Sequence, residues 1–241
     1  MPPPLVLSFD LDDTLWPVGP VIASAERDLW SWLRERHPQA VSGHSIESLR
    51  EMRAHVAERY PEHGHDLTFL RHRALKDLFE RAGRANPPID AQYPTDAKYA
   101  TDTERLADEA FEVFFAARNR VEIYDDVRPS LERLHARYRL FALSNGNADL
   151  KRSGVDRWFT GHVTARGAGA AKPDARIFAH LLAQAGVEAH QVLHIGDDPV
   201  TDVAGAMQAG MQAVWLNRDA RAWPQGLAPP PRTITTLAEI D

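Results

Sequence analysis

The amino-acid sequence predicts an α/β protein with a doubly wound parallel sheet and one inserted, all-helical domain. Short apolar runs near the N-terminus and after about residue 139 have the length and composition of buried strands. Helical patterns lie between the later runs. The stretch from about residue 21 to residue 119 contains helical patterns and no convincing strand. Strands that alternate with helices are typical of a parallel sheet covered on both faces.

The predicted strands are continuous apolar runs rather than alternating ones, as expected for strands that are buried on both sides. Leu5–Phe9 is the first of them, and residues 162–165 form a weaker candidate. The other three are Leu140–Ser144, Val192–Gly196 and Ala213–Leu216. Apolar stripes between the later runs predict helices, one through Ile177, Leu181, Leu182 and Ala185 and a shorter one through Ala204, Met207 and Gln208 that stops near Gly210.

The long insertion after the first strand shows four helical patterns. The clearest stripes are Val21, Ile22, Ala25, Leu29 and Trp32, then Leu67, Leu70, Ala74 and Leu78, then Leu106, Ala110, Phe111 and Phe114. Turn-rich breaks separate them, notably at residues 83–94. A crossover between two strands is much shorter, so we expect a catalytic core formed by residues 1–17 and 123–241 and a helical domain at 18–122.

The composition excludes several classes of protein. A net charge of -6 argues against nucleic acid or an anionic membrane as the main partner. No cysteine is present, so any metal must be held by oxygen or imidazole ligands. No apolar stretch is long enough to span a bilayer, and the N-terminal residues lack the features of a secretory signal. We therefore expect a cytoplasmic protein, with a monomer as the default.

Two acidic motifs follow predicted strands. Asp10, Asp12 and Thr14 come where the first strand ends, and Asp197 and Asp202 follow the strand at 192–196. Ligands bind at the carboxyl ends of strands in open α/β sheets. Two carboxylates one residue apart suit a nucleophile and a proton-transfer group, and carboxylates are preferred ligands of Mg²⁺. Taken singly, each motif fits a polar turn or a helix cap equally well.

Two further motifs complete the pattern. Ser144 and Asn145 follow the strand at 140–144, where a hydroxyl and backbone N–H groups suit a phosphate oxygen. Lys172 precedes Pro173, which suits the first position of a helix, and a cation at a helix start suggests a partner anion. Alone, the first is an ordinary turn and the second a solvated lysine. Four such clusters in this order, each after a strand or before a helix, predict one site at one sheet edge.

Together these motifs resemble those of the haloacid dehalogenase (HAD) superfamily, in which a Rossmann-like core carries an inserted cap. The resemblance covers the whole chain, none of the four motifs departs from the pattern, and the helical block is similar to the first type of cap. The strings FDLDDTLW, SNGN and HIGDDPVTDVAGAMQAGM resemble a bacterial branch with phosphatases of FMN and of 5-amino-6-(5-phosphoribitylamino)uracil.

The resemblance implies a role for each motif residue. Asp10 is the expected nucleophile and Asp12 the general acid and base. Asp10, Asp197, Asp202 and the main-chain carbonyl of Asp12 are the expected surroundings of Mg²⁺. The residues expected to contact the phosphate are Thr14, Ser144, Asn145 and Lys172, of which Ser144 and Lys172 also take part in catalysis.

The expected activity is thus Mg²⁺-dependent hydrolysis of a small phosphorylated metabolite through an aspartyl phosphate, with a place in riboflavin biosynthesis if the branch resemblance holds. Three alternatives stay open. A hydrolytic dehalogenase of the same fold needs neither metal nor Asp12, and a phosphomutase would return the phosphoryl group to a sugar. A non-catalytic phosphate-binding module belongs to a different class, and the presence of every motif residue argues against it.

Overall fold

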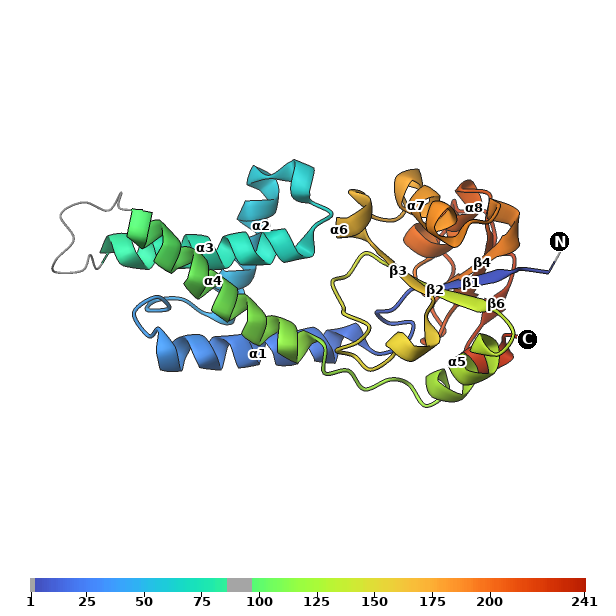
Figure 1. The fold of residues 1–241 in the computed structure, drawn as a ribbon, viewed down its shortest axis with the longest axis horizontal. Helices are drawn as coiled ribbons and strands as arrows, with labels where there is room; N and C mark the ends of the chain where they lie inside the picture. The colour runs from blue at the N-terminus through green and yellow to red at the C-terminus, as the bar shows by residue number, and fades with distance from the viewer. Residues whose placement is uncertain (1–2, 86–96) are drawn as a thin grey trace. The chain divides into compact units, whose positions relative to one another are not determined.

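The computed structural model describes residues 3–85 and 97–241. Most of the turn-rich segment at 83–94 lies outside the described residues. By its own contacts the chain divides into two compact units, Met1–Val18 with Val121–Asp241, and Gly19–Arg120 (Figure 1). We call them the core unit and the helical unit. That residues 18–122 act as a separate cap domain stays a prediction.

The core unit contains one six-stranded sheet in the order β3-β2-β1-β4-β5-β6, and all paired neighbours are parallel. This confirms the predicted α/β fold. The strands are β1 Val6–Phe9, β2 Arg139–Ser144, β3 Gly161–Thr164, β4 Val192–Gly196, β5 Gln212–Leu216 and β6 Thr233–Ile234. The two-residue β6 was not predicted, because so short an element has no apolar run of its own.

Helices cover both faces of this sheet. Figure 1 shows α7 and α8 on one side and α5 on the other. The helices are α5 Val127–His135, α6 Ala165–Ala168, α7 Ala175–Ala185 and α8 Gly205–Gln208, and a six-residue π-helical segment, Pro199–Ala204, precedes α8. The face of the sheet that α7 covers packs on three fully buried side chains of that helix, Ile177, Phe178 and Leu181.

The predicted start of the helix after Lys172 was wrong by two residues. Asp174 is the N-cap of α7, and Pro173 precedes that cap. The reason is local, because the side-chain amide of Asn145 binds both the N–H and the carbonyl group of Lys172. The residue is therefore tied to the neighbouring strand end rather than to the helix.

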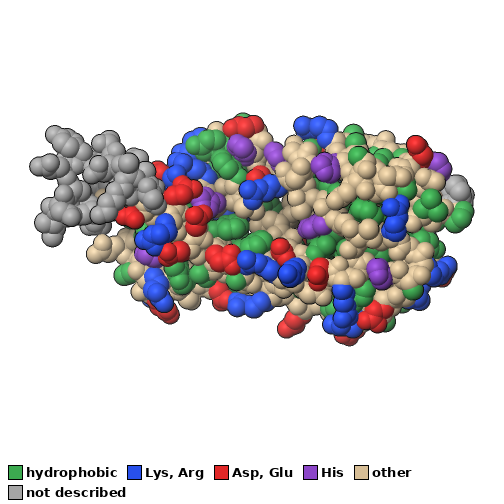
Figure 2. Space-filling view, viewed as in Figure 1, with side chains coloured by type: hydrophobic (Ala, Val, Ile, Leu, Met, Phe, Trp, Pro, Cys, Tyr) green, Lys and Arg blue, Asp and Glu red, His purple; other side chains and the backbone are tan. Residues whose placement is uncertain are grey.

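The helical unit consists of α1 Val18–Arg36, α2 Ile46–Arg59, α3 Leu67–Ala85 and α4 Ala97–Arg118. Most residues of the predicted stripes form or border its core, with Leu29, Leu78 and Phe114 among the most buried side chains, but Leu67 is 45% exposed. Within the described ranges, no helix combines the length and apolar character needed to cross a membrane. Figure 2 shows acidic and basic side chains interspersed on the visible face.

Candidate active site

Strand register brings the acidic motifs together. Phe9, the last residue of β1, pairs with Ala142 of β2 on one side and with Ile195 of β4 on the other. Asp10 directly follows, and its N–H donates to the carbonyl of Ile195 at 2.9 Å. Parallel neighbours in this register place residues 10, 144 and 197 at the same edge of the sheet.

The loop after β1 is held by its own side chains. Asp13 has a φ of 58°, in the left-handed region, and its carboxylate accepts from the N–H of Val18 at 2.8 Å. Trp16 is fully buried, and its indole N–H donates to Asp12 Oδ1 at 2.7 Å. Trp16 is therefore a packing residue that also fixes the orientation of Asp12, and Asp13 serves the turn.

Lys172 is the buried cation of the site. Its ammonium group donates to Asp10 Oδ1 at 2.6 Å, to Asp202 Oδ1 at 2.6 Å and to the carbonyl of Leu143 at 2.8 Å. An ammonium group has three N–H bonds, so these three acceptors use all of them. A bound phosphate would have to replace one of these acceptors before Lys172 touched it.

The residues after β4 form the second acidic part of the site. Gly196 is required there, because a Cβ at that position would clash with the carboxyl group of Asp202. Asp198 caps the following turn by accepting from the N–H groups of Val200 and Thr201. Its own N–H donates to Asp202 Oδ2 at 2.9 Å, which fixes the second oxygen of Asp202.

Burial and mutual repulsion shift the acidity of these groups. Burial raises the pKa of Asp10 well above its ordinary value, and Asp202 and Asp12 add to this while Lys172 opposes it. Burial, with Asp202, raises the pKa of Asp197 to about 6, and Arg221 opposes the shift. Burial alone would raise the pKa of Asp202, but Lys172 and His194 hold it well below its ordinary value. The positive charge near Asp10 and Asp197 is therefore too small to stabilise both carboxylates in their ionised form.

The three carboxylates fit a divalent cation. Asp10, Asp197 and Asp202 each offer an oxygen, and these oxygens all lie within 4.8 Å of one another. Hard oxygen ligands suit Mg²⁺, and the raised pKa values of Asp10 and Asp197 mark a deficit of positive charge that the ion would make good. Both oxygens of Asp202 already have protein partners, so it suits a supporting role.

Two residues predicted to contact phosphate have other partners. The side chain of Asn145 is engaged at both ends by the main chain of Lys172, at 2.7 and 3.0 Å. Thr14 is fully buried, and its hydroxyl lies 3.4 Å from Asp197 Oδ1. Their contact with phosphate stays a prediction, and the structure adds that Asn145 holds the main chain of Lys172 and that Thr14 approaches Asp197. Ser144 is buried at the end of β2, and its Oγ accepts from the N–H of Gly146 at 2.9 Å.

Sequence reasoning missed three supporting residues. His194 is fully buried between Ser8, at 3.0 Å, and Asp202, at 3.3 Å, and burial lowers its pKa. Arg221 donates to the carbonyl of Asp197 at 2.7 Å and to its Oδ2 at 3.0 Å. Arg218 donates to the carbonyl of Thr14 at 3.0 Å. The string NRDAR directly after β5, at the same sheet edge, was the available clue for the two arginines.

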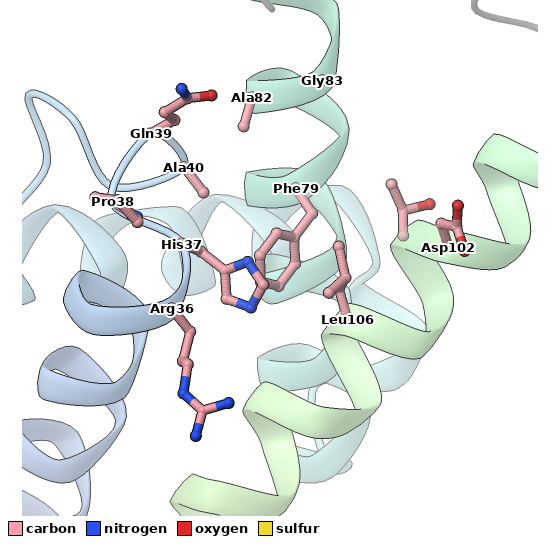
Figure 3. Close-up of a pocket in the computed structure, with 11 residues that line it drawn as sticks. Arg36, His37, Pro38, Gln39, Ala40, Phe79, Ala82, Gly83, Asp102 and Leu106 are labelled. Carbon is pink, nitrogen blue, oxygen red and sulfur yellow. The ribbon is translucent and has the colours of Figure 1, made fainter. Parts of the chain in front are cut away.

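A cavity of about 490 Å³ lies elsewhere, within the helical unit (Figure 3). Its lining comes from the end of α1 and from α3 and α4, and it includes His37 edge-on to Phe79, with Arg36 and Asp102 nearby. None of the motif residues lines it. Its size alone is not evidence of chemistry, and the paired carboxylates with their lysine make the sheet edge the better candidate.

The fold and this arrangement define a class, an enzyme with a Rossmann-like α/β core and an aspartate-centred site at the carboxyl edge of its parallel sheet. Residues 5–210 match the family model of the haloacid dehalogenase-like hydrolases, so the chain belongs to that family and is an enzyme of the HAD hydrolase superfamily.

Several relatives cover nearly the whole chain. It is 30% identical to the Escherichia coli 5-amino-6-(5-phospho-D-ribitylamino)uracil phosphatase YigB, over 92% of this chain and 89% of that protein. It is 29% identical to a Thermus thermophilus phosphoserine phosphatase over 90% of each. A solved 2-haloacid dehalogenase from Pseudomonas syringae is 37% identical, with a TM-score of 0.85 over 98% of this chain and 95% of that one.

Proposed function

We propose that this enzyme is a Mg²⁺-dependent phosphatase that hydrolyses a small-molecule phosphate monoester through an aspartyl phosphate on Asp10. One observation carries the proposal: Asp10 is buried at the sheet edge, bonded to Lys172 at 2.6 Å and grouped with Asp197. A carboxylate with a cation on one side and a set of metal-suited oxygens on the other is equipped to meet a phosphate dianion.

In the first step a carboxylate oxygen of Asp10 attacks phosphorus in line with the ester oxygen. The P–O bond to the leaving group breaks, and the alkoxide takes a proton from Asp12. The indole N–H of Trp16 holds Asp12 Oδ1 at 2.7 Å, so the acid is oriented before substrate arrives. Lys172 shares its charge between Asp10 and Asp202 and limits the repulsion between nucleophile and phosphate.

In the second step Asp12 accepts a proton from water, and the water oxygen attacks the phosphorus of the aspartyl phosphate. The acyl phosphate bond breaks, inorganic phosphate leaves and the carboxylate of Asp10 is restored. The proton that Asp12 lost in the first step is thereby regained, so the cycle needs no other reactant than water. Ser144, buried at the end of β2, is the proposed hydroxyl partner of the transferring group.

Asp10, Asp197 and the main-chain carbonyl of Asp12 are the proposed ligands of Mg²⁺, with Asp202 in support. When bound, the ion would supply positive charge to phosphate oxygens and to the nucleophile. The excess of carboxylates over cations at the sheet edge supports this assignment.

The substrate class is proposed from the relatives. YigB, named for a phosphorylated ribitylaminouracil, matches 92% of this chain, which favours that ester or the related FMN and a role in riboflavin synthesis. The helical unit is the proposed cap that selects the leaving group, because the four motifs all lie in the core unit. We place the enzyme in the cytoplasm as a monomer that binds neither nucleic acid nor membrane.

A dehalogenase is the second candidate, favoured by the 37% identity to the Pseudomonas syringae protein named for that activity. Displacement of halide from carbon requires no metal and no acid two residues after the nucleophile. Asp197 has its pKa raised to about 6 by burial, and so costs the metal-free protein stability at neutral pH. A partly buried carboxylate with a raised pKa, grouped with Asp10 and Asp202, is better explained by a metal-using phosphatase.

The deciding experiment measures phosphate release from a panel of esters, including FMN and the ribitylaminouracil phosphate, with Mg²⁺ and with EDTA. Chloride release from 2-chloropropionate is measured in parallel. Metal-dependent phosphate release is the expected result. Chloride release that is insensitive to EDTA, with no ester hydrolysed, would replace the phosphatase by the dehalogenase.

A further inference from the structure

The helical unit contains a group of arginines that the proposed chemistry does not use. Arg50 and Arg53 of α2 and Arg71 of α3 surround Glu26 of α1, and we call these four residues the arginine cluster. Glu26 is 5% exposed, so it is a buried carboxylate. Three guanidinium groups from two helices thus face one buried acid on a third.

The cluster is unevenly paired. Arg50 takes Glu26 Oε2 with two nitrogens, at 2.6 and 2.8 Å, and also lies 3.8 Å from the exposed Glu47. Arg53 and Arg71 both face the other oxygen, Glu26 Oε1, at 3.9 and 3.7 Å. Those distances exceed hydrogen-bond length. Even when Glu47 is counted, three guanidinium groups face two carboxylates.

Burial and two neighbouring arginines disfavour the charge of Arg71, whereas the ring of Phe114 and the carboxylate of Glu26 favour it. Its guanidinium stacks 3.5 Å above the ring of Phe114, and its side chain is 12% exposed. Burial lowers its pKa to about 9, and repulsion from Arg53 and Arg50 adds to this while Glu26 opposes it. An additional anion beside Arg53 and Arg71 would relieve that repulsion.

There is room for an anion's oxygen at this point. A small cavity of about 20 Å³ is lined by Arg53, Arg71 and apolar side chains such as Leu29 and Met52. That volume holds one water-sized atom. The Arg53 side chain is 34% exposed, so the cavity borders a surface from which the rest of the anion could approach.

We propose that the arginine cluster binds the carboxylate or phosphate group of a small molecule through Arg53 and Arg71. One oxygen of that group occupies the small cavity and accepts from the N–H groups of Arg53 and Arg71, which lie beyond hydrogen-bond distance of Glu26 Oε1. The group belongs either to a separate small anion or to the leaving-group portion of a carboxylate-bearing ester such as phosphoserine, which would then replace the riboflavin-pathway esters as the substrate. The binding step itself does not depend on the proposed phosphatase activity.

The test is a calorimetric titration of the full-length, metal-free protein with inorganic sulfate. Without metal the sheet edge is rich in carboxylates and repels sulfate, so binding reports on the arginine cluster. We expect Arg53→Met to weaken sulfate binding at least tenfold. We expect Glu26→Gln to tighten it at least twofold, because the competing carboxylate is gone.

Arg59→Met is the matched control, because Arg59 is also on α2 and is ion-paired with Asp77 outside the cluster. It should bind sulfate like the wild type, and the circular dichroism of each variant checks its fold. Three results would each contradict the proposal: no sulfate binding by the wild type, equal binding by Arg53→Met, or weaker binding by Glu26→Gln. The arginine cluster would then be only an ion-pair network between helices.

A second measurement identifies the source of the anion. Phosphoserine carries a carboxylate on its leaving group, whereas p-nitrophenyl phosphate does not. A rise in KM for phosphoserine alone in Arg53→Met assigns the site to substrate recognition, and unchanged discrimination assigns it to a separate anion. If the wild type hydrolyses neither of these esters nor any ester of the panel above, the phosphatase proposal fails while the sulfate result stands.

Discussion

The two units contain polar networks with opposite imbalances of charge. At the sheet edge of the core unit, one lysine, Lys172, lies between Asp10 and Asp202, with Asp197 close by. In the helical unit, three arginines surround Glu26. The excess of carboxylates in the first network suits a bound cation, and the excess of arginines in the second suits a bound anion.

The networks also differ in how tightly they are built. Lys172 makes two ion pairs of 2.6 Å with side chains that are at most 11% exposed. In the arginine cluster, two of the three arginines stand beyond hydrogen-bond distance, and the arginine side chains are 12 to 49% exposed. The short, buried ion pairs of Lys172 fix the positions of reacting atoms. The longer and more exposed pairs of the arginine cluster leave space for a ligand.

The largest expected effect is on turnover in Asp10→Asn. Asparagine keeps the shape of the side chain and removes its nucleophilic charge, so phosphate release should fall on the order of 10⁴-fold or more. Asp174→Asn is the matched control, because asparagine caps a helix as well as aspartate does and α7 begins there. Phosphate release in Asp10→Asn at the rate of the control would remove Asp10 from the mechanism.

The next effect compares the networks by stability. Lys172→Met leaves Asp10 and Asp202 buried without their cation and should lower the free energy of unfolding by about 3–5 kcal/mol. Arg53→Met removes from the arginine cluster a partly exposed arginine that lies 3.9 Å from Glu26, and it should cost about 0–1 kcal/mol. Urea unfolding of both variants in EDTA measures the two costs. Similar costs would contradict the contrast between a buried and an exposed network.

Much of this arrangement followed from the sequence, and what did not has a physical reason. The apolar runs predicted five of the six strands, because continuous burial leaves a clear pattern. The ends of those strands predicted which motif residues meet. The bonds of Asn145 to Lys172 and of Thr14 to Asp197 were not predicted, because the type of a polar residue does not reveal its partner. His194 was missed because it lies inside an apolar strand, where a histidine reads as core.

Metal binding should sense pH through the core network. Burial raises the pKa of Asp197 to about 6, so its proton must leave before a cation binds. We expect the Mg²⁺ dissociation constant to be nearly constant above that pH and to rise up to tenfold per unit below it. Titration calorimetry from pH 7.5 to 5 measures this. A dissociation constant that stays flat to pH 5 would show that Asp197 is ionised throughout or is not a ligand.

The same raised pKa has the opposite consequence for the metal-free protein. An acid with a folded-state pKa above its unfolded value of about 3.9 destabilises the fold when ionised. The contribution of Asp197 to stability therefore increases as pH falls from about 7 towards 4. Comparison with Asp197→Asn, unfolded in EDTA at each pH, isolates this contribution from those of other groups. A wild-type curve that parallels the variant would contradict the raised pKa.

The smallest expected effect concerns Arg221, which lies beside Asp197, a proposed ligand of Mg²⁺. Arg221 is 44% exposed in its side chain and lies 3.0 Å from Asp197 Oδ2, so it competes weakly with a cation for that oxygen. Half-exposed ion pairs contribute about 0.2–1 kcal/mol, so Arg221→Met should tighten Mg²⁺ binding by at most about fivefold. Arg157→Met, which removes a 3.2 Å pair with Glu132 in the same unit, should leave it unchanged. Weaker Mg²⁺ binding in Arg221→Met would instead mean that the bond of Arg221 to the carbonyl of Asp197 holds this aspartate in position. The geometry of the core network would then matter more for Mg²⁺ binding than its balance of charge.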